Sequence, residues 1–427
     1  MNVARGLFGI VVLVFIAWLL SSNRRRFPVK TVAAGMALQW LLALLVLKTE
    51  PGRAFFDAIA HVVTAVLAGA DAGADFVFGP LTGNHPSVAW KAIAGIKIMT
   101  TIIIVATISS IGYHYGILQR IVSAMAWLMT RTMGVSGAEA LAGAANVFFG
   151  QTEAPLLVRP YISGMTRSEI MAMMTGGFAT VAAGVMAVYV DMLGQGDTGR
   201  MVEVARHLMT ASLMSAPAAF MLAKIMVPET ATSQTAGTVK VRLDRDTKSF
   251  IDAATSGAGE GMKLAINVLA MLIAFVAIIK VVDIALTALG HVSFMEPVVA
   301  SMGLKELNLD GLLGLAFSPV AFLAGVDGGD YRTFGGLLGK AMATNELIAY
   351  SSLGQIIHDG GMSERSTLIA TYSLCGFANL SSIGIQIGGI GGLAPDRRAD
   401  LVQLGPRAML GGAMACWMTG CIAGVLV

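Results

Sequence analysis

Residues 150–155 read GQTEAP and place the acid Glu153 between two apolar stretches of the chain. A second acid, Glu346, lies within the sequence TNELIAY at residues 344–350, which is also flanked by apolar sequence. Because a carboxylate inside a bilayer costs at least ~2.5 kcal/mol, an acid in such a position is by default a functional-site hypothesis. Paired polar interruptions are typical of secondary transporters, in which broken helices meet at the substrate. We therefore predict two hairpin tips that meet at one binding site.

The composition around these acids is that of a membrane protein. Of the 427 residues, 56% are hydrophobic and 13% are charged, whereas soluble domains carry roughly 25% charged residues. Long apolar runs of this kind predict an all-α polytopic membrane protein, because helices satisfy their own backbone within the bilayer. The net charge of +3 gives no indication of nucleic-acid binding. The motifs HExxH, GxSxG and Walker A are absent from the sequence, so it lacks the signatures of several common enzyme classes.

Eight stretches match the ~20 apolar residues that a membrane helix needs. A basic cluster at 24–26 follows the first stretch, which favours a retained helix over a cleaved signal peptide. With strict alternation, the basic residues at 24–30, 120–167, 240–248 and 397–407 fall in predicted cytoplasmic segments, as the positive-inside rule requires. This topology places both termini in the periplasm. The eight stretches are 6–22, 31–48, 91–112, 168–193, 204–227, 262–288, 366–390 and 406–427.

Three further apolar regions do not fit as simple crossings. Region 54–70 is predicted to be an interfacial helix. Regions 117–163 and 308–357 contain the two acids, and each is long enough for an amphipathic helix followed by a re-entrant hairpin. Such a hairpin persists at membrane depth only where protein buries it or where it lines a cavity. We therefore expect both hairpins to point into the protein.

The order hairpin, helix, helix occurs twice. Ser136 and Glu139 form a capping-box pattern at the start of the first hairpin. Alternation places the first hairpin on the cytoplasmic side and the second on the periplasmic side, so the two copies form an inverted repeat. The matching sequences are GMTRS from 164 and GFATV from 177 in one copy, and GMSERS from 361 and GFANL from 376 in the other. The predicted divisions are 1–133 for scaffold and interfacial helices, 134–227 for the first repeat, 228–333 for a cytoplasmic linker, a scaffold helix and an interfacial helix, and 334–427 for the second repeat.

Two groups of polar residues are candidates for substrate binding. The first offers amide donors, acceptor oxygens, a hydroxyl and a carboxylate, which suit a polar heterocycle such as a nucleobase. The second offers a carboxylate, an amide and a hydroxyl, which suit two vicinal hydroxyls of a sugar. The alternatives are a hairpin tip tied to neighbouring backbone and polar contacts between helices. The groups are Gln151, Thr152 and Glu153, and Glu346, Asn379 and Ser382.

Asn146 and Thr180 are candidates for binding a small hard cation. Hard cations prefer oxygen ligands, and the free carbonyl groups of a broken helix would complete such a site. The alternative is that the Thr180 hydroxyl bonds back to a carbonyl of its own helix.

Three motifs together are similar to those of the concentrative nucleoside transporter family. They are NVFFGQTEAP at 146–155, Lys340 followed by NE at 345–346 and AY at 349–350, and CGFANxSS at 375–382. The similarity covers nearly the whole chain. It implies a homotrimer in the lipid bilayer, whose scaffold surrounds mobile transport domains, and nucleoside uptake driven by a cation gradient. It also implies which residues hold each part of the ligand: Gln151, Thr152 and Glu153 the base, with Val185 beside it; Glu346, Asn379 and Ser382 the ribose, with Phe377 beside it; and Asn146 and Thr180 a sodium ion, with the backbone carbonyls near Phe149 and Val181.

These observations predict a sodium-coupled importer (symporter) of nucleosides such as uridine in a bacterial inner membrane. No cofactor is expected, and sodium is the expected coupling ion. Thr180 replaces the serine typical of bacterial sodium-coupled members but keeps the hydroxyl. Two alternatives stay open. One is a proton-coupled nucleoside symporter on the same scaffold, with the proton on Glu153 or Glu346. The other is an intramembrane enzyme that uses these two acids.

Overall fold

The computed structural model describes residues 2–82, 94–235, 237 and 247–427, which form helices and turns without a strand. This confirms the all-α prediction. The α-helices are α1 (Asn2–Leu19), α2 (Val29–Lys48), α3 (Glu50–Phe78), α4 (Ala94–His114), α5 (Ile117–Met133), α6 (Gly137–Asn146), α7 (Arg159–Ile162), α8 (Arg167–Ala179), α9 (Ala183–Gly194), α10 (Thr198–Met226), α11 (Phe250–Gly290), α12 (Glu296–Ser301), α13 (Leu309–Leu323), α14 (Tyr331–Ala343), α15 (Glu346–His358), α16 (Glu364–Ser373), α17 (Leu380–Leu393) and α18 (Arg398–Leu426). The 3-10 helices are η1 (Gly79–Thr82), η2 (Ala154–Val158), η3 (Gly328–Asp330) and η4 (Pro395–Arg397).

Among the described residues, eight helical segments are long and apolar enough to cross a membrane. Seven of them coincide with predicted stretches. Residues 91–93 of the predicted stretch 91–112 and residues 240–246 of the predicted linker lie outside the described residues. The predicted stretch 366–390 has no matching segment, and the eighth segment is α3 instead. The protein is therefore a multi-pass membrane protein, with one candidate crossing that the sequence did not predict.

Helix α3 is longer than the interfacial helix predicted at 54–70. The Thr49 side chain caps its start by accepting a hydrogen bond from the Gly52 backbone N–H at 3.2 Å. The helix then runs for 29 residues to Phe78 and ends at Gly79, whose φ is 51°. A helix of this length measures ~43 Å, more than the ~30 Å of the bilayer core. Its length makes α3 a candidate crossing.

Two predicted crossings are each broken in the middle. The stretch 168–193 forms α8 and α9, which are separated at 180–182, and the stretch 366–390 forms α16 and α17, which are separated at 374–379. The prediction of continuous helices is therefore wrong at both places. Asn379 explains the second break, because its side chain accepts a hydrogen bond from the Ser382 backbone N–H at 2.8 Å and starts a new helix.

The two predicted hairpins are present as paired short helices. In the first, Ser136 and Glu139 form the predicted capping box, which confirms the start of α6. The returning arm is the 3-10 helix η2 followed by the short α7, with Pro155 in the first turn of η2. In the second hairpin α14 is followed by α15, and the Asn345 side chain caps α15 through the Ile348 backbone N–H at 3.0 Å. Glu346 is consequently the first residue of a helix, where the helix dipole favours an acid.

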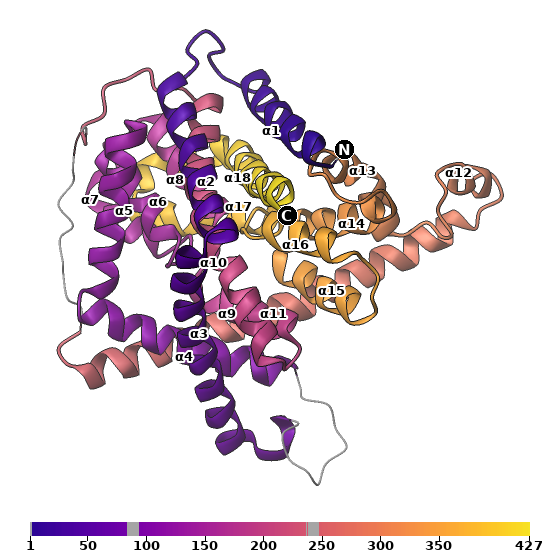
Figure 1. Ribbon diagram of the computed structural model, residues 1–427, viewed down its shortest axis with the longest axis horizontal. Coiled ribbons are helices and arrows are strands. Elements are labelled where there is room, and N and C mark those ends of the chain that lie inside the picture. The colour runs from indigo at the N-terminus through magenta and orange to yellow at the C-terminus, as the bar shows by residue number, and fades with distance from the viewer. Residues whose placement is uncertain (1, 83–93, 236, 238–246) are drawn as a thin grey trace.

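The hairpins lie on opposite sides of a central group of helices. In Figure 1 the elements of the first hairpin are on the left, those of the second are on the right, and α8, α10, α17 and α18 lie between them. Helices α10 and α18 are long and largely buried, and each contains a proline. The order of elements, hairpin, broken helix and long helix, is thus the same in both halves of the protein.

Helix α11 has the opposite character, because it is long and little of it is buried. It extends for 41 residues and packs mainly against α4. Only 6% of its most apolar window is buried, and its exposed side chains include Ile266, Ile273 and Val276. An apolar surface of this extent is what contact with lipid or another membrane helix requires.

A buried ion pair anchors the first hairpin to α10. Lys224 Nζ lies 2.8 Å from Glu139 Oε2, and the two side chains are 7% and 2% exposed. Replacing Lys224 with methionine leaves a buried carboxylate without its cation, so we expect a loss of about 3–5 kcal/mol in the free energy of unfolding. Thermal unfolding of the purified protein in detergent measures this change.

The pair Lys340 and Asp310 gives a matched control for this experiment. Its atoms are also 2.8 Å apart, but the Lys340 and Asp310 side chains are 18% and 50% exposed, so solvent reaches the pair. Exposed pairs contribute about 0–1 kcal/mol, so Lys340→Met should change stability little. Equal losses in both variants would contradict the anchoring role of Lys224.

Candidate substrate and cation site

Glu346 and Asn379 meet at the starts of helices α15 and α17. Asn379 Nδ2 donates to Glu346 Oε2 at 2.8 Å, and the Tyr189 hydroxyl donates to Glu346 Oε1 at 3.0 Å. Glu346 is 6% exposed and Asn379 is 2% exposed. Both carboxylate oxygens therefore have a donor, as a buried acid requires, and each keeps further acceptor capacity.

Aromatic packing fixes the position of Tyr189. Its ring stacks on that of Tyr350 with centroids 4.2 Å apart. The Tyr350 hydroxyl in turn donates to the Thr371 carbonyl oxygen at 2.8 Å. Both rings are fully buried, so packing holds Tyr189 of α9 against Glu346 of α15.

Gln151 connects the tip of the first hairpin to helix α17. Its Nε2 donates to Ser382 Oγ at 3.0 Å, and its Oε1 accepts from Gln386 Nε2 at 3.0 Å. Gln386 Nε2 also donates to the Met174 carbonyl oxygen at 3.1 Å. The predicted base residue Gln151 and the predicted ribose residue Ser382 are thus in direct contact.

The remaining predicted substrate residues lie nearby in the chain but make no described hydrogen bond to this group. Glu153 is exposed and Thr152 is half-buried, both at the hairpin tip. Val185 is buried in the first turn of α9, and Phe377 is half-buried in the break before α17. The two acids differ in environment, since Glu346 is buried between its donors and Glu153 is open. No contact described in the structure joins them as an enzymatic acid pair would be joined.

The candidate cation residues lie where α6 and α8 both end. Asn146 is the last residue of α6 and is 1% exposed, and neither Nδ2 nor Oδ1 has a hydrogen-bond partner among the described residues. The Thr180 hydroxyl donates to the carbonyl oxygens of Gly176 at 2.9 Å and Asn146 at 3.0 Å. The bond to Gly176 is the predicted alternative, in which the Thr180 hydroxyl bonds back to a carbonyl of its own helix. The bond to the Asn146 carbonyl joins the two candidate residues.

These residues fit an oxygen-ligated ion. A buried amide without a partner costs roughly 1–3 kcal/mol, and an ion at Asn146 Oδ1 would remove that cost. The Thr180 oxygen keeps lone pairs after donating its proton. Phe149 and Val181 both lie outside helices, and their carbonyl oxygens accept no hydrogen bond described in the structure.

Tyr189 and Gln386 were not predicted as site residues. Gln386 follows Asn379 and Ser382 at helical spacing in α17, so the same face that carries the two predicted residues also carries it. That spacing was a usable signal. Tyr189 gave none, because its partner Glu346 lies 157 positions away in the sequence.

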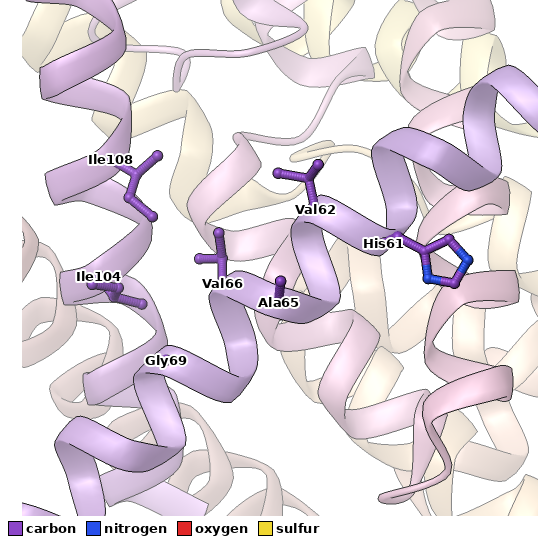
Figure 2. Close-up of a pocket in the computed structure, with 7 residues that line it drawn as sticks. All are labelled: His61, Val62, Ala65, Val66, Gly69, Ile104 and Ile108. Carbon is purple, nitrogen blue, oxygen red and sulfur yellow. The ribbon is translucent and has the colours of Figure 1, made fainter.

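A hollow between α3 and α4 lies apart from this polar group. Figure 2 shows Val62 and Val66 of α3 facing Ile104 and Ile108 of α4 across it. Apart from His61 at its edge its lining is apolar. It lacks the convergent polar groups of a site for a polar ligand.

Polar breaks in paired helices that meet at one site are the architecture of a secondary transporter. The chain belongs to the Na+ dependent nucleoside transporter family. Family descriptions match it at "Na+ dependent nucleoside transporter N-terminus" over residues 8–81, "Nucleoside recognition" over 95–196 and "Na+ dependent nucleoside transporter C-terminus" over 207–424. The protein is accordingly a transporter and not an enzyme.

Relatives along the whole chain support this assignment. An uncharacterized transporter of Haemophilus influenzae is 38% identical, with 100% of this chain and 98% of the relative covered. Solute carrier family 28 member 3 of Homo sapiens is 35% identical over 98% of this chain and 59% of its own length. The solved structure of CNTnw in an inward-facing substrate-bound state has a TM-score of 0.88 at 34% identity, covering 100% of this chain and 98% of that one. A CNTnw variant in an outward-facing state gives a TM-score of 0.87 at 34% identity over 100% and 98% of the two chains, so solved relatives occupy both states of alternating access.

Proposed function

We propose that this protein is a sodium-coupled symporter that imports nucleosides such as uridine by alternating access. The observation that carries the proposal is the contact between the repeats, where Gln151 meets Ser382 and Tyr189 meets Glu346. A ligand bound there touches both repeats, so its binding and release are linked to their relative movement. Membership of a sodium-dependent nucleoside transporter family supports the choice of substrate class and ion.

The two ends of the nucleoside bind to different groups. Gln151, Thr152 and Glu153 hold the base, beside Val185. Glu346, Asn379 and Ser382 hold the ribose hydroxyls, beside Phe377. A carboxylate is the strongest neutral-pH acceptor for hydroxyl donors, and Glu346 has two further buried donors that hold it in place.

Sodium binds to Asn146 Oδ1 and Thr180 Oγ1, with the backbone carbonyls of Phe149 and Val181. When bound, the ion supplies a positive charge that fixes the ends of α6 and α8. These ends lead directly into the hairpin tip that contains Gln151, so sodium raises nucleoside affinity. By linkage, nucleoside raises sodium affinity by the same factor.

In the cell we place the protein in a bacterial inner membrane, as a homotrimer with both termini in the periplasm and with the repeats inverted. The exposed apolar surface of α11 supports burial against lipid or another copy. Cross-linking in membranes measures the number of subunits, and labelling of cysteines added near each terminus measures its side of the membrane.

The function is tested by uptake of radiolabelled uridine into proteoliposomes. We expect an inward sodium gradient to stimulate uptake several-fold over an equal choline gradient, because the ion and the nucleoside bind together. Empty liposomes and an excess of unlabelled uridine control for leakage. Uptake that ignores sodium but follows an inward proton gradient would show proton coupling, and no uptake under either gradient would refute the substrate.

A further inference from the structure

Gln386 is a fully buried residue of α17 whose side chain contacts two different elements. It is 0% exposed. Its Nε2 lies 3.1 Å from the Met174 carbonyl oxygen in α8 and 3.0 Å from Gln151 Oε1 at the hairpin tip. The residue therefore connects the broken helix of the first repeat to the candidate base-binding residue.

These contacts define the orientation of two amide groups. A backbone carbonyl can only accept a hydrogen bond, so the nitrogen of Gln386, and not its oxygen, must face Met174. The same nitrogen faces Gln151, so the oxygen of Gln151 must point toward Gln386. The nitrogen of Gln151 then points the other way, toward Ser382 Oγ at 3.0 Å. The carbonyl of Met174 thus determines which end of the Gln151 amide faces the ligand residues.

The backbone of α8 is shaped to admit this pair of glutamines. A Cβ atom at Gly177 would lie 2.9 Å from Gln386 Nε2 and 3.0 Å from Gln151 Cβ. Real Cβ atoms essentially never approach closer than 3.0 Å, so a side chain at this position would displace the amide end of Gln386. Gly177 leaves the space in which Gln386 reaches Gln151.

We propose that Gln386 is a positioning residue that selects nucleobases through Gln151. It holds the Gln151 amide with its NH2 group toward the ligand. The selected ligands are nucleosides whose base presents a hydrogen-bond acceptor, such as a carbonyl oxygen, to that group. This inference rests on the proposed function.

The test compares competition by analogues in the wild type and in Gln386→Met, which keeps the length of the side chain but cannot donate. Two base probes each lack one strong acceptor of uridine: 2-thiouridine at the 2-position and the pyrimidin-2-one ribonucleoside at the 4-position. The sugar probe is 3′-deoxyuridine. The penalty of an analogue is the factor by which it competes more weakly than uridine. We expect the larger of the two base penalties to be about fivefold smaller in the variant, since one neutral hydrogen bond contributes ~1 kcal/mol. The sugar penalty should not change.

Gln39 provides a matched control. It is also 0% exposed, its Nε2 lies 3.4 Å from the Gly35 carbonyl oxygen, and like Gln386 its Oε1 has no partner among the described residues. Gln39→Met removes a similar buried amide far along the chain from the candidate site, and all three penalties should stay at their wild-type values.

A second variant keeps the inference testable if Gln386→Met fails to fold. In Gln386→Glu the buried carboxyl group is protonated and donates to the Met174 carbonyl, while its other oxygen accepts from the Gln151 nitrogen. This reverses the Gln151 amide, which should change the ratio of uridine to cytidine affinity. Unchanged base penalties in Gln386→Met, or an unchanged ratio in Gln386→Glu, in protein that still transports uridine would overturn the positioning role alone. A wild-type protein that neither binds nor transports any nucleoside would overturn the proposed function and this inference with it.

Discussion

Substitution of Glu346 by glutamine is expected to lower uridine affinity by at least about 100-fold. The wild-type carboxylate accepts from Tyr189 and Asn379 and, in the proposed complex, from ribose hydroxyls. Glutamine removes the charge and replaces one acceptor oxygen with an NH2 group, which cannot accept a hydrogen bond from a ribose hydroxyl. Hydrogen bonds to charged groups contribute about 1.5–3 kcal/mol each, so the loss of two accounts for a factor of this size.

Binding of uridine to the purified protein, measured by calorimetry, separates this effect from changes in transport rate. Glu364→Gln is a suitable control, because Glu364 is an exposed acid in the first turn of α16. It should leave uridine affinity unchanged. Wild-type affinity in Glu346→Gln would remove Glu346 from the ribose site.

Replacement of Asn146 by leucine is expected to abolish the sodium dependence of uptake without weakening the fold. No hydrogen bond among the described residues uses the Asn146 side chain, which is 1% exposed. Leucine therefore breaks no hydrogen bond that the structure describes, and removal of an unpartnered buried amide should leave stability equal or higher. The same change removes an oxygen ligand from the proposed ion site.

Two measurements check this pair of expectations. Uptake is followed across sodium concentrations, and thermal unfolding is followed with and without sodium. Sodium at 100 times its Kd should stabilise the wild type by about 2.7 kcal/mol and the variant by almost nothing. Thr180→Val should behave like Asn146→Leu. Thr175→Val should respond normally to sodium, because among the described residues the Thr175 hydroxyl makes one hydrogen bond, to the Met171 carbonyl oxygen within α8. A normal sodium response in Asn146→Leu would place the ion elsewhere.

The sequence was most informative where a local rule connects residue type to structure. The capping box at Ser136 and Glu139 predicted the start of α6, because its two hydrogen bonds join residues three positions apart. The acids Glu153 and Glu346 located both hairpin tips, since lipid excludes such residues unless they have a use. Residue roles in substrate and ion binding remain predictions.

The breaks in the two crossings were not predicted, although one signal was present. An apolar run looks the same in a continuous helix and in two half-helices, because hydropathy does not record backbone hydrogen bonds. The Asn379 and Ser382 pattern is that of a helix N-cap, and reading it as such would have divided 366–390. The contact between Tyr189 and Glu346 was beyond sequence reasoning, since it depends on how distant helices pack.

The exposed helix α11 has a consequence for the lipid around the protein. Lys263 and Lys280 are both exposed, and between them lie the uncharged residues 264–279. Sixteen helical residues measure ~24 Å, which is shorter than the ~30 Å hydrocarbon core of a typical bilayer. The two lysines must extend toward the headgroups, or the bilayer must become thinner beside the helix. Acyl-chain length is therefore a variable to hold constant when transport rates are compared between membranes.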